Sequence, residues 1–126
     1  VSLLSALNLH GMIEQIPRAI HIVVVNQRRR IATPVGRYEF HQLSKELIAG
    51  HKPYGRLGLF ELATPDKALF DVLYFSVRKG KRFARLPELE LPAGCRRKDV
   101  DSWIKRIPYR SLREAVKERW NAIPTD

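Results

Sequence analysis

The chain has 126 residues, a length typical of one domain, and its 44% hydrophobic and 29% charged content is that of a folded globule rather than a disordered chain. The absence of any apolar run of about 18 residues excludes a membrane span. Lys and Arg outnumber Asp and Glu by 23 to 13, so the formal net charge is +10. We therefore expect one domain over residues 1–126, no membrane partner, and a polyanionic partner, usually nucleic acid.

The single cysteine, Cys95, cannot form an internal disulfide, which fits a reducing compartment. The first twelve residues lack the basic region and the cleavage site of a signal peptide. We therefore expect a cytoplasmic protein. Because the sequence begins with Val rather than Met, we also expect the chain to be a fragment of a longer protein.

The first third of the chain predicts one helix followed by short strands. Leucines recur at helical spacing within residues 2–15, which predicts a helix that Pro17 ends. The β-branched run over residues 20–25 predicts a buried strand. Residues 26–42 hold a Thr-Pro-Val-Gly turn between two strand-like segments, so we expect an antiparallel hairpin there.

The second strand of this hairpin, residues 37–42, alternates in polarity. Tyr38 and Phe40 point to one face, which predicts a half-buried strand. The other face carries Arg37, Glu39 and His41. Further along the chain we expect one or two helical turns over residues 44–49, a glycine-rich loop over 50–58 and a strand over 57–63.

The sequence Thr-Pro-Asp at residues 64–66 predicts a helix start, because a Thr cap, a Pro at the first position and an acid near the positive helix end are all favourable. A broad apolar face continues to about Ser76, which predicts a largely buried central helix. Two more helices are expected over 99–107 and 111–123, capped by Asp99 and Ser111. The predicted fold class is α+β: a small mixed or antiparallel sheet with a hairpin, packed against an N-terminal helix, a central helix and C-terminal helices.

Side chains suited to metal binding or nucleophilic catalysis are sparse. None of the four histidines, His10, His21, His41 and His51, forms an HxH or HxxxH pair, so we expect no metal and no cofactor, although convergence in space stays open. Neighbouring cations could lower the pKa of Cys95, but nothing around it resembles a catalytic motif, so we interpret it as an incidental surface thiol. We therefore predict no catalytic residue and no enzymatic activity.

A divergent metal-dependent nuclease is the enzymatic alternative. Pro65 and Asp66 begin like the PD-(D/E)xK pattern, in which clustered carboxylates hold the metal ion. No acid after Asp66 is followed two residues later by Lys on a predicted strand. The position of Asp66 in the first helical turn explains this residue without any catalytic role.

Basic residues gather in three clusters, over residues 28–30, 78–85 and 96–98. Such clusters bind phosphates without reading the base sequence. We predict DNA contacts by six residues of the first two clusters: Arg28, Arg29, Arg30, Lys79, Lys81 and Arg82. No helix-turn-helix is predicted, so a freestanding module that binds nucleic acid non-specifically is an alternative function.

Four blocks of the sequence resemble the AbiEi family of antitoxins and transcriptional regulators, in the same order and with the same spacing. One block reads Leu-Ala-Thr-Pro-Asp-Lys-Ala-Leu-Phe-Asp over residues 62–71. The others cover residues 5–17, 28–40 and 86–92. The resemblance extends over about residues 2–92, and the C-terminal helices are similar to the family only in character.

The resemblance implies the antitoxin-side, C-terminal-type domain of a self-repressing regulator in a type IV toxin–antitoxin (abortive phage infection) system. It implies a nucleotidyltransferase-like toxin as functional partner, without direct contact. In the family a winged-helix domain that reads the operator comes first, and residues 1–126 do not include one, either because it was removed or because the gene lacks it.

Three polar residues of these blocks, Glu14, Lys67 and Asp71, are the least explained by the predicted fold. Lys67 and Asp71 are four residues apart on the predicted central helix. Residues at this spacing are neighbours on a helix surface. We therefore interpret the two as an ordinary helix ion pair in preference to a functional polar patch.

Overall fold

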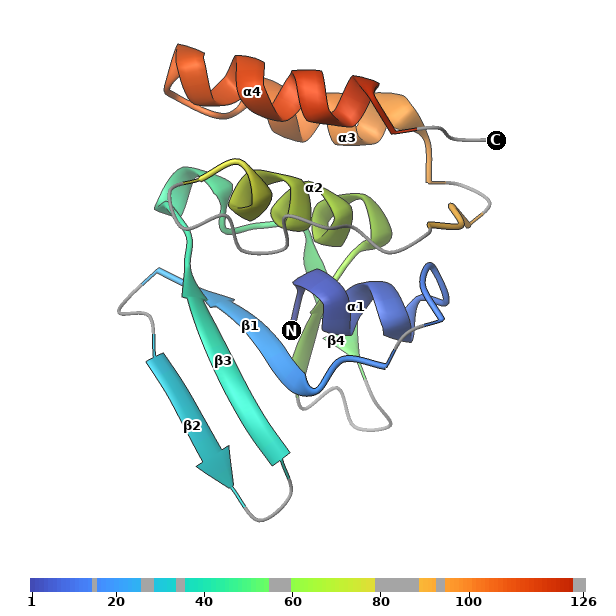
Figure 1. Cartoon of the computed structure of the whole chain (residues 1–126), viewed down its shortest axis with the longest axis vertical. Coiled ribbons are helices and arrows are strands. Elements are labelled where there is room, and N and C mark those ends of the chain that lie inside the picture. Colours follow the sequence, from blue (N-terminus) through green and yellow to red (C-terminus); the bar gives the residue numbers. More distant parts are fainter. Residues whose placement is uncertain are drawn as a thin grey trace.

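The structure is a computed structural model that describes residues 1–14, 16–25, 29–33, 36–54, 60–78, 89–92 and 95–123. Over these residues it has the predicted α+β class (Figure 1). The helices are α1 (Leu3–Leu9), α2 (Pro65–Ser76), α3 (Arg97–Lys105) and α4 (Arg110–Asn121), with a 3₁₀ turn, η1 (Lys45–Leu47). The strands are β1 (Ala19–Val24), β2 (Arg29–Thr33), β3 (Gly36–Gln42), β4 (His51–Tyr54) and β5 (Phe60–Ala63).

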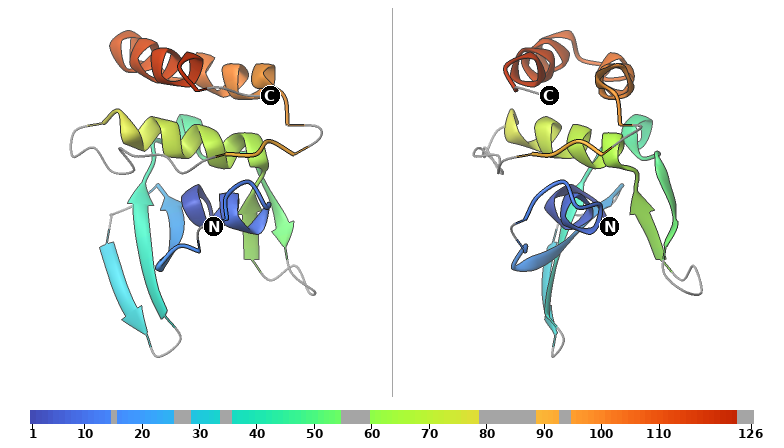
Figure 2. Two further views of the ribbon diagram at one scale, coloured as in Figure 1. Left: turned by 45° about the vertical axis from the view of Figure 1, so that its right-hand side comes forward. Right: turned by 90° about the vertical axis from the view of Figure 1, so that its right-hand side faces the viewer.

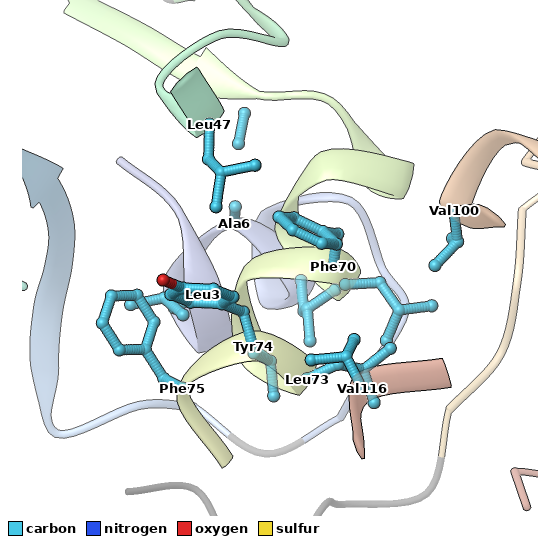
Figure 3. Close-up of a cluster of buried hydrophobic side chains, with 14 of the residues drawn as sticks. Leu3, Ala6, Leu47, Phe70, Leu73, Tyr74, Phe75, Val100 and Val116 are labelled. Atoms are coloured by element: carbon cyan, nitrogen blue, oxygen red, sulfur yellow. The ribbon is translucent and has the colours of Figure 1, made fainter. Parts of the chain in front are cut away.

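Helix α2 lies in the middle of the molecule, between two layers (Figure 2). On one side α3 and α4 run next to each other, and on the other side α1 lies between the two sheets. Ten of the twelve residues of α2 are buried, because α1, α3 and α4 all pack against it. Figure 3 shows side chains from these helices and from η1 meeting in the core, among them Leu3, Leu47, Phe70, Val100 and Val116.

The larger sheet has the strand order β1-β3-β2. Strands β2 and β3 form the predicted antiparallel hairpin, with Thr33 opposite Gly36. Strand β1 pairs with β3 in parallel, from Ala19 opposite Arg37 to Val24 opposite Gln42. The sheet is therefore mixed, with β3 between its two neighbours.

The buried face of this sheet carries histidines. His21 and His41 are 7% and 3% exposed, whereas Tyr38 and Phe40 on the opposite face of β3 are only half-buried. The helices pack on the histidine side: the His41 ring lies 5.5 Å from the ring of Phe75 on α2, measured between centroids. An alternating strand is ordinarily buried on its apolar face, but in β3 the buried residue is His41 of the polar face, while Arg37 on the same face is exposed.

The first helix is shorter than predicted. The sequence predicts a helix over residues 2–15, but α1 ends at Leu9. Gly11 has a φ of 73°, a left-handed conformation that glycine adopts without strain and that is common just after a helix end. Met12 and Ile13 are nevertheless buried. Their apolar side chains continue the hydrophobic pattern of α1 in the sequence, although these residues lie outside the helix.

The second sheet corrects another prediction. The segment 50–58, predicted as a loop, contains β4, which pairs antiparallel with β5 and places His51 opposite Ala63. All residues of β4 are exposed and one of them is Pro53, so no alternation of polarity marks the strand. Proline is tolerated at the edge of a sheet, which is where β4 lies among the described strands.

The remaining helices match the prediction to within two residues. Helix α2 begins at Pro65 as predicted, and α3 and α4 begin two residues and one residue before the predicted starts. Asp99, predicted as a cap, lies inside the first turn of α3 and accepts a hydrogen bond from the Arg96 backbone N–H at 3.2 Å. Tyr109 takes the cap position predicted for Ser111. None of the described helices has the length and hydropathy that crossing a membrane requires.

Candidate functional site

The structure describes only two of the six cations predicted to bind nucleic acid. Arg29 and Arg30 lie on β2, at the edge of the larger sheet, where the structure describes the backbone. The other four lie outside the described residues: Arg28, Lys79, Lys81 and Arg82. These contacts therefore stay a prediction, and Arg78 is the basic residue of the second cluster that the structure describes.

A surface hollow of about 660 Å³ lies beside the end of α2. Lys45, Arg78 and the exposed ring of Tyr109 line it. The Arg78 guanidinium lies 5.3 Å from the centre of the Tyr74 ring, which also lines the hollow. Glu46 contributes one negative charge to the same lining. Cations next to an exposed aromatic ring are suited to contacting phosphates and stacking on bases.

The C-terminal helices present a strongly basic surface. Residues 95–123 contain nine Lys or Arg and four Asp or Glu, an excess of five positive charges. Two of the acids pair with neighbouring arginines: Asp99 with Arg96 at 3.6 Å and Glu114 with Arg110 at 3.2 Å. The exposed cations are Arg96, Lys98, Lys105, Arg106, Arg110 and Lys117. Because α3 and α4 form an outer layer (Figure 2), this surface lies on the opposite side of the molecule from the sheets.

A buried ion pair occupies the middle of α2. Lys67 and Asp71 are 1% and 0% exposed, and the Lys67 ammonium donates a hydrogen bond to the Asp71 carboxylate. The Ser2 hydroxyl donates a second hydrogen bond to Asp71, at 2.6 Å. Burial raises the pKa of the Asp71 carboxyl and lowers the pKa of the Lys67 amine, while the attraction between the two charges opposes both shifts. The sequence predicts the partners of this pair but not its burial.

Aromatic rings surround the Lys67 ammonium, which lies 5.4 Å from the centre of the Phe70 ring and 5.3 Å from that of Trp103. A hollow of about 490 Å³ adjoins the pair between β1 and β5. Its rim carries His51 and Glu61, and His51 Nδ1 lies 2.7 Å from Glu61 Oε2. Because Lys67 and Asp71 are already bound to each other, we assign this pair to the scaffold of the fold.

Two of the four histidines converge with a glutamate on the buried face of the larger sheet. His21 Nδ1 lies 2.9 Å from His41 Nε2. Glu39 Oε2 lies 3.5 Å from the first nitrogen and 3.9 Å from the second. Burial lowers the pKa of His21, and the charge of Glu39 opposes this shift.

The strand register creates this cluster. It places Glu39 directly opposite His21, while His41 lies two residues further along the same face of β3. Sequence spacing gives no sign of the cluster, because His21 meets the other two residues only when β1 pairs with β3. The other histidines are elsewhere: His10 contacts the Ala63 carbonyl at 2.7 Å, and His51 pairs with Glu61.

Cys95 is half-buried and is not activated by the cations near it in sequence. Burial raises the pKa of its thiol to about 11, and the charges of Asp66 and Asp99 act in the same direction. A thiol with so high a pKa carries little of the reactive thiolate at neutral pH. The sequence predicts a surface thiol, whereas the side chain is half-buried.

Comparison with known proteins gives no match. No family model matches the chain, and neither a curated protein nor a solved structure is significantly similar to it. Function is therefore inferred from the residues and surfaces of this chain.

Proposed function

We propose that the chain is a non-catalytic domain that binds nucleic acid in the cytoplasm through a basic surface, as the antitoxin-side domain of an AbiEi-like regulator. The observation that carries the binding part is the excess of five positive charges over residues 95–123, on the outer layer formed by α3 and α4. Each Lys or Arg that contacts a phosphate adds affinity by releasing counterions, without reading sequence. The lining of the hollow at Arg78 and Tyr109 supports the same partner.

The AbiEi-like part rests on the four sequence blocks. The block 62–71 covers the junction from β5 to α2, and the block 28–40 covers β2 and most of β3. Such a domain would counteract a nucleotidyltransferase-like toxin from the same operon without touching it. A freestanding module with the same basic surface but no toxin is the second candidate.

The described acids do not favour the nuclease alternative. Asp66 accepts a hydrogen bond from the Trp103 indole N–H at 2.8 Å. Asp71 is bound by Lys67 and Ser2. Carboxylates that are already engaged in this way are poor candidates for holding a catalytic metal ion.

Charge-matched variants test the binding surface. One variant replaces Lys98, Lys105 and Lys117 of the outer layer by Glu. Its control replaces three exposed cations elsewhere by Glu: Arg18, Arg37 and Lys52. Both variants lower the net charge from +10 by the same six units, to +4, so only the position of the charges differs. The measurement is fluorescence anisotropy of a labelled DNA duplex over a series of salt concentrations.

We expect the outer-layer variant to bind DNA at least about tenfold more weakly than its control and with a shallower salt dependence. Equal losses in both variants would mean that net charge alone matters and would reject the surface. A third variant, Arg28→Glu with Arg29→Glu and Arg30→Glu, measures the contribution of the cluster predicted from the sequence.

The antitoxin assignment has a separate test. The chain is co-expressed with the nucleotidyltransferase gene adjacent to its own gene, and growth is measured. Rescue from the toxin is expected. If the toxin is present but growth is not restored, the antitoxin assignment is rejected, and the DNA measurement decides independently whether the domain binds nucleic acid.

A further inference from the structure

We infer that His21, Glu39 and His41 form a binding site for one divalent transition-metal ion, and that zinc is the ion the donor set fits best. Two imidazole nitrogens and one carboxylate oxygen are donors that zinc prefers when thiolates are absent. The three donor atoms lie within 4.8 Å of one another on one face of the β1–β3 pair. This inference is independent of the proposed nucleic-acid surface.

The distances among the donors match those around a single ion. Metal–ligand bonds of about 2.0–2.1 Å in a tetrahedral arrangement place any two ligand atoms about 3.3 Å apart. The three distances in the cluster are 2.9, 3.5 and 3.9 Å, on both sides of that value. The two imidazoles need to separate by roughly 0.4 Å to admit the ion.

A hydrogen bond between the two histidines is the simpler explanation of part of this geometry. One neutral imidazole can donate its proton to the other, which accounts for the 2.9 Å contact between His21 and His41. Glu39 lies within ion-pair distance of both nitrogens, at 3.5 and 3.9 Å, so its charge would attract either ring in the protonated form. A shared metal ion would use all three donor atoms at once, and zinc titration distinguishes it from these contacts.

The surrounding structure holds the imidazoles in place. The His21 backbone N–H donates to the Ser5 hydroxyl at 2.9 Å, and the His21 carbonyl accepts from the Ser2 backbone N–H at 2.9 Å. The His41 ring packs against Phe75 of α2. Ligands carried by paired strands and supported by packed neighbours are preorganised, which lowers the entropy that metal binding must overcome.

The side chain of Glu39 is 24% exposed, so the site has a path to solvent. Three protein ligands leave a fourth position for water. One ligand comes from β1 and two come from β3, and an unfolded chain does not hold these residues together. A bound ion therefore joins the two strands and stabilises the folded chain.

The test uses the full chain with Cys95→Ser in every sample, so that no thiol contributes to binding. The protein is stripped with a chelator and titrated with zinc chloride by calorimetry, and the bound metal is counted by elemental analysis. We expect one zinc per chain and a thermal midpoint that rises when zinc is added. His41→Gln and Glu39→Gln should each lower zinc affinity at least tenfold.

His51→Gln is the matched control, because it removes a histidine that lies outside the cluster and is partly exposed. It should leave zinc affinity unchanged. Circular dichroism first establishes that each variant is folded. If His41→Gln does not fold, Glu39→Gln is compared with His51→Gln instead. The Glu39 side chain is the most exposed of the three, so its substitution disturbs the fold least.

Two results would overturn the inference. One is that the chelator-stripped chain with all four histidines binds no zinc. The other is that folded Glu39→Gln and His41→Gln proteins bind zinc as tightly as His51→Gln does. In either case the cluster is a histidine hydrogen bond next to a carboxylate and has no metal-binding function.

Discussion

At the scale of single residues, the buried pair Lys67 and Asp71 should be highly sensitive to substitution. Removing one partner leaves the other charge in the core without compensation, which is far more costly than losing an exposed pair. We expect Lys67→Met to lower the free energy of unfolding by about 3–5 kcal/mol, measured by urea denaturation. The double variant Lys67→Met with Asp71→Leu should recover part of this loss, because it removes both charges.

The exposed pair Arg110 and Glu114 is the control for this prediction. It has the same spacing of four residues on a helix, but both side chains are exposed. Arg110→Met should change the free energy of unfolding by no more than about 1 kcal/mol. Similar losses for Lys67→Met and Arg110→Met would show that the burial of the α2 pair has no energetic consequence.

Gly50 provides a second residue-scale prediction. Its φ is 77°, and a Cβ added there would lie 2.5 Å from Trp103 Cζ2 and 2.9 Å from Lys67 Cγ. Gly11 has a similar φ of 73° with open space around it. Both substitutions to Ala carry the backbone strain, about 1–2 kcal/mol, but only Gly50→Ala also overpacks the core.

We therefore expect Gly50→Ala to cost about 2–4 kcal/mol of unfolding free energy and Gly11→Ala about 1–2 kcal/mol. Urea denaturation of the two variants measures the difference. If both variants lose the same free energy of unfolding, the tight packing of Gly50 against Trp103 is not present in solution.

Cys95 gives a prediction about reactivity. With its pKa raised to about 11, the folded protein at pH 8 carries far less thiolate than a free thiol does. Alkylation by iodoacetamide at this pH should be slower in the folded chain than in urea by on the order of a hundredfold. Raising the pH toward 11 should accelerate the reaction. Equal rates in the folded and unfolded chains would contradict the raised pKa.

At the scale of elements, β3 and β2 differ in how many neighbours they have. Strand β3 is hydrogen-bonded to β1 on one side and to β2 on the other, whereas β2 pairs only with β3 among the described strands. Backbone amides without a partner exchange readily with solvent. Amide exchange followed by NMR should therefore show slow exchange along β3 and fast exchange at alternate residues of β2. Equal protection along both strands would mean that β2 has a second partner.

Helix caps and turn motifs in the sequence predict the elements that begin or end at them. The Thr-Pro-Asp start of α2 lies where the sequence predicts it, and so does the antiparallel pairing of Thr33 with Gly36. The exposed strand β4 has no such signal, because its stability depends on pairing with β5 rather than on burial. Elements that rest on distant partners cannot be predicted from local pattern alone.

The candidate sites likewise depend on contacts between segments that are distant in the sequence. The cluster of Arg96 and Lys98 is visible in the sequence, whereas the sequence alone does not show that α3, with Lys105, and α4, with Lys117, form one outer layer. The meeting of His21 with Glu39 depends on the register of two strands that are separated by a hairpin. Spacing within one segment carries no information about such a register.

At the scale of the whole molecule, α2 separates the two candidate sites. The basic layer of α3 and α4 lies on one side of this helix, and the sheet with His21 and His41 lies on the other (Figure 1). The two sites share no residue. We therefore expect substitutions in the outer layer to leave zinc affinity unchanged. Substitutions in the histidine cluster should likewise leave DNA affinity unchanged.

The parallel pairing of β1 with β3 has a consequence for how the chain assembles. Strands β2 and β3 are adjacent in sequence, so their hairpin can close on the microsecond timescale. Strand β1 is synthesised first, but its partner is β3, which leaves the ribosome last of the three strands. Strand β1 can therefore pair only after the hairpin of β2 and β3 has been synthesised. The central strand, β3, is thus synthesised after both of its neighbours. Strand β1 has no strand partner in this sheet until β3 has left the ribosome.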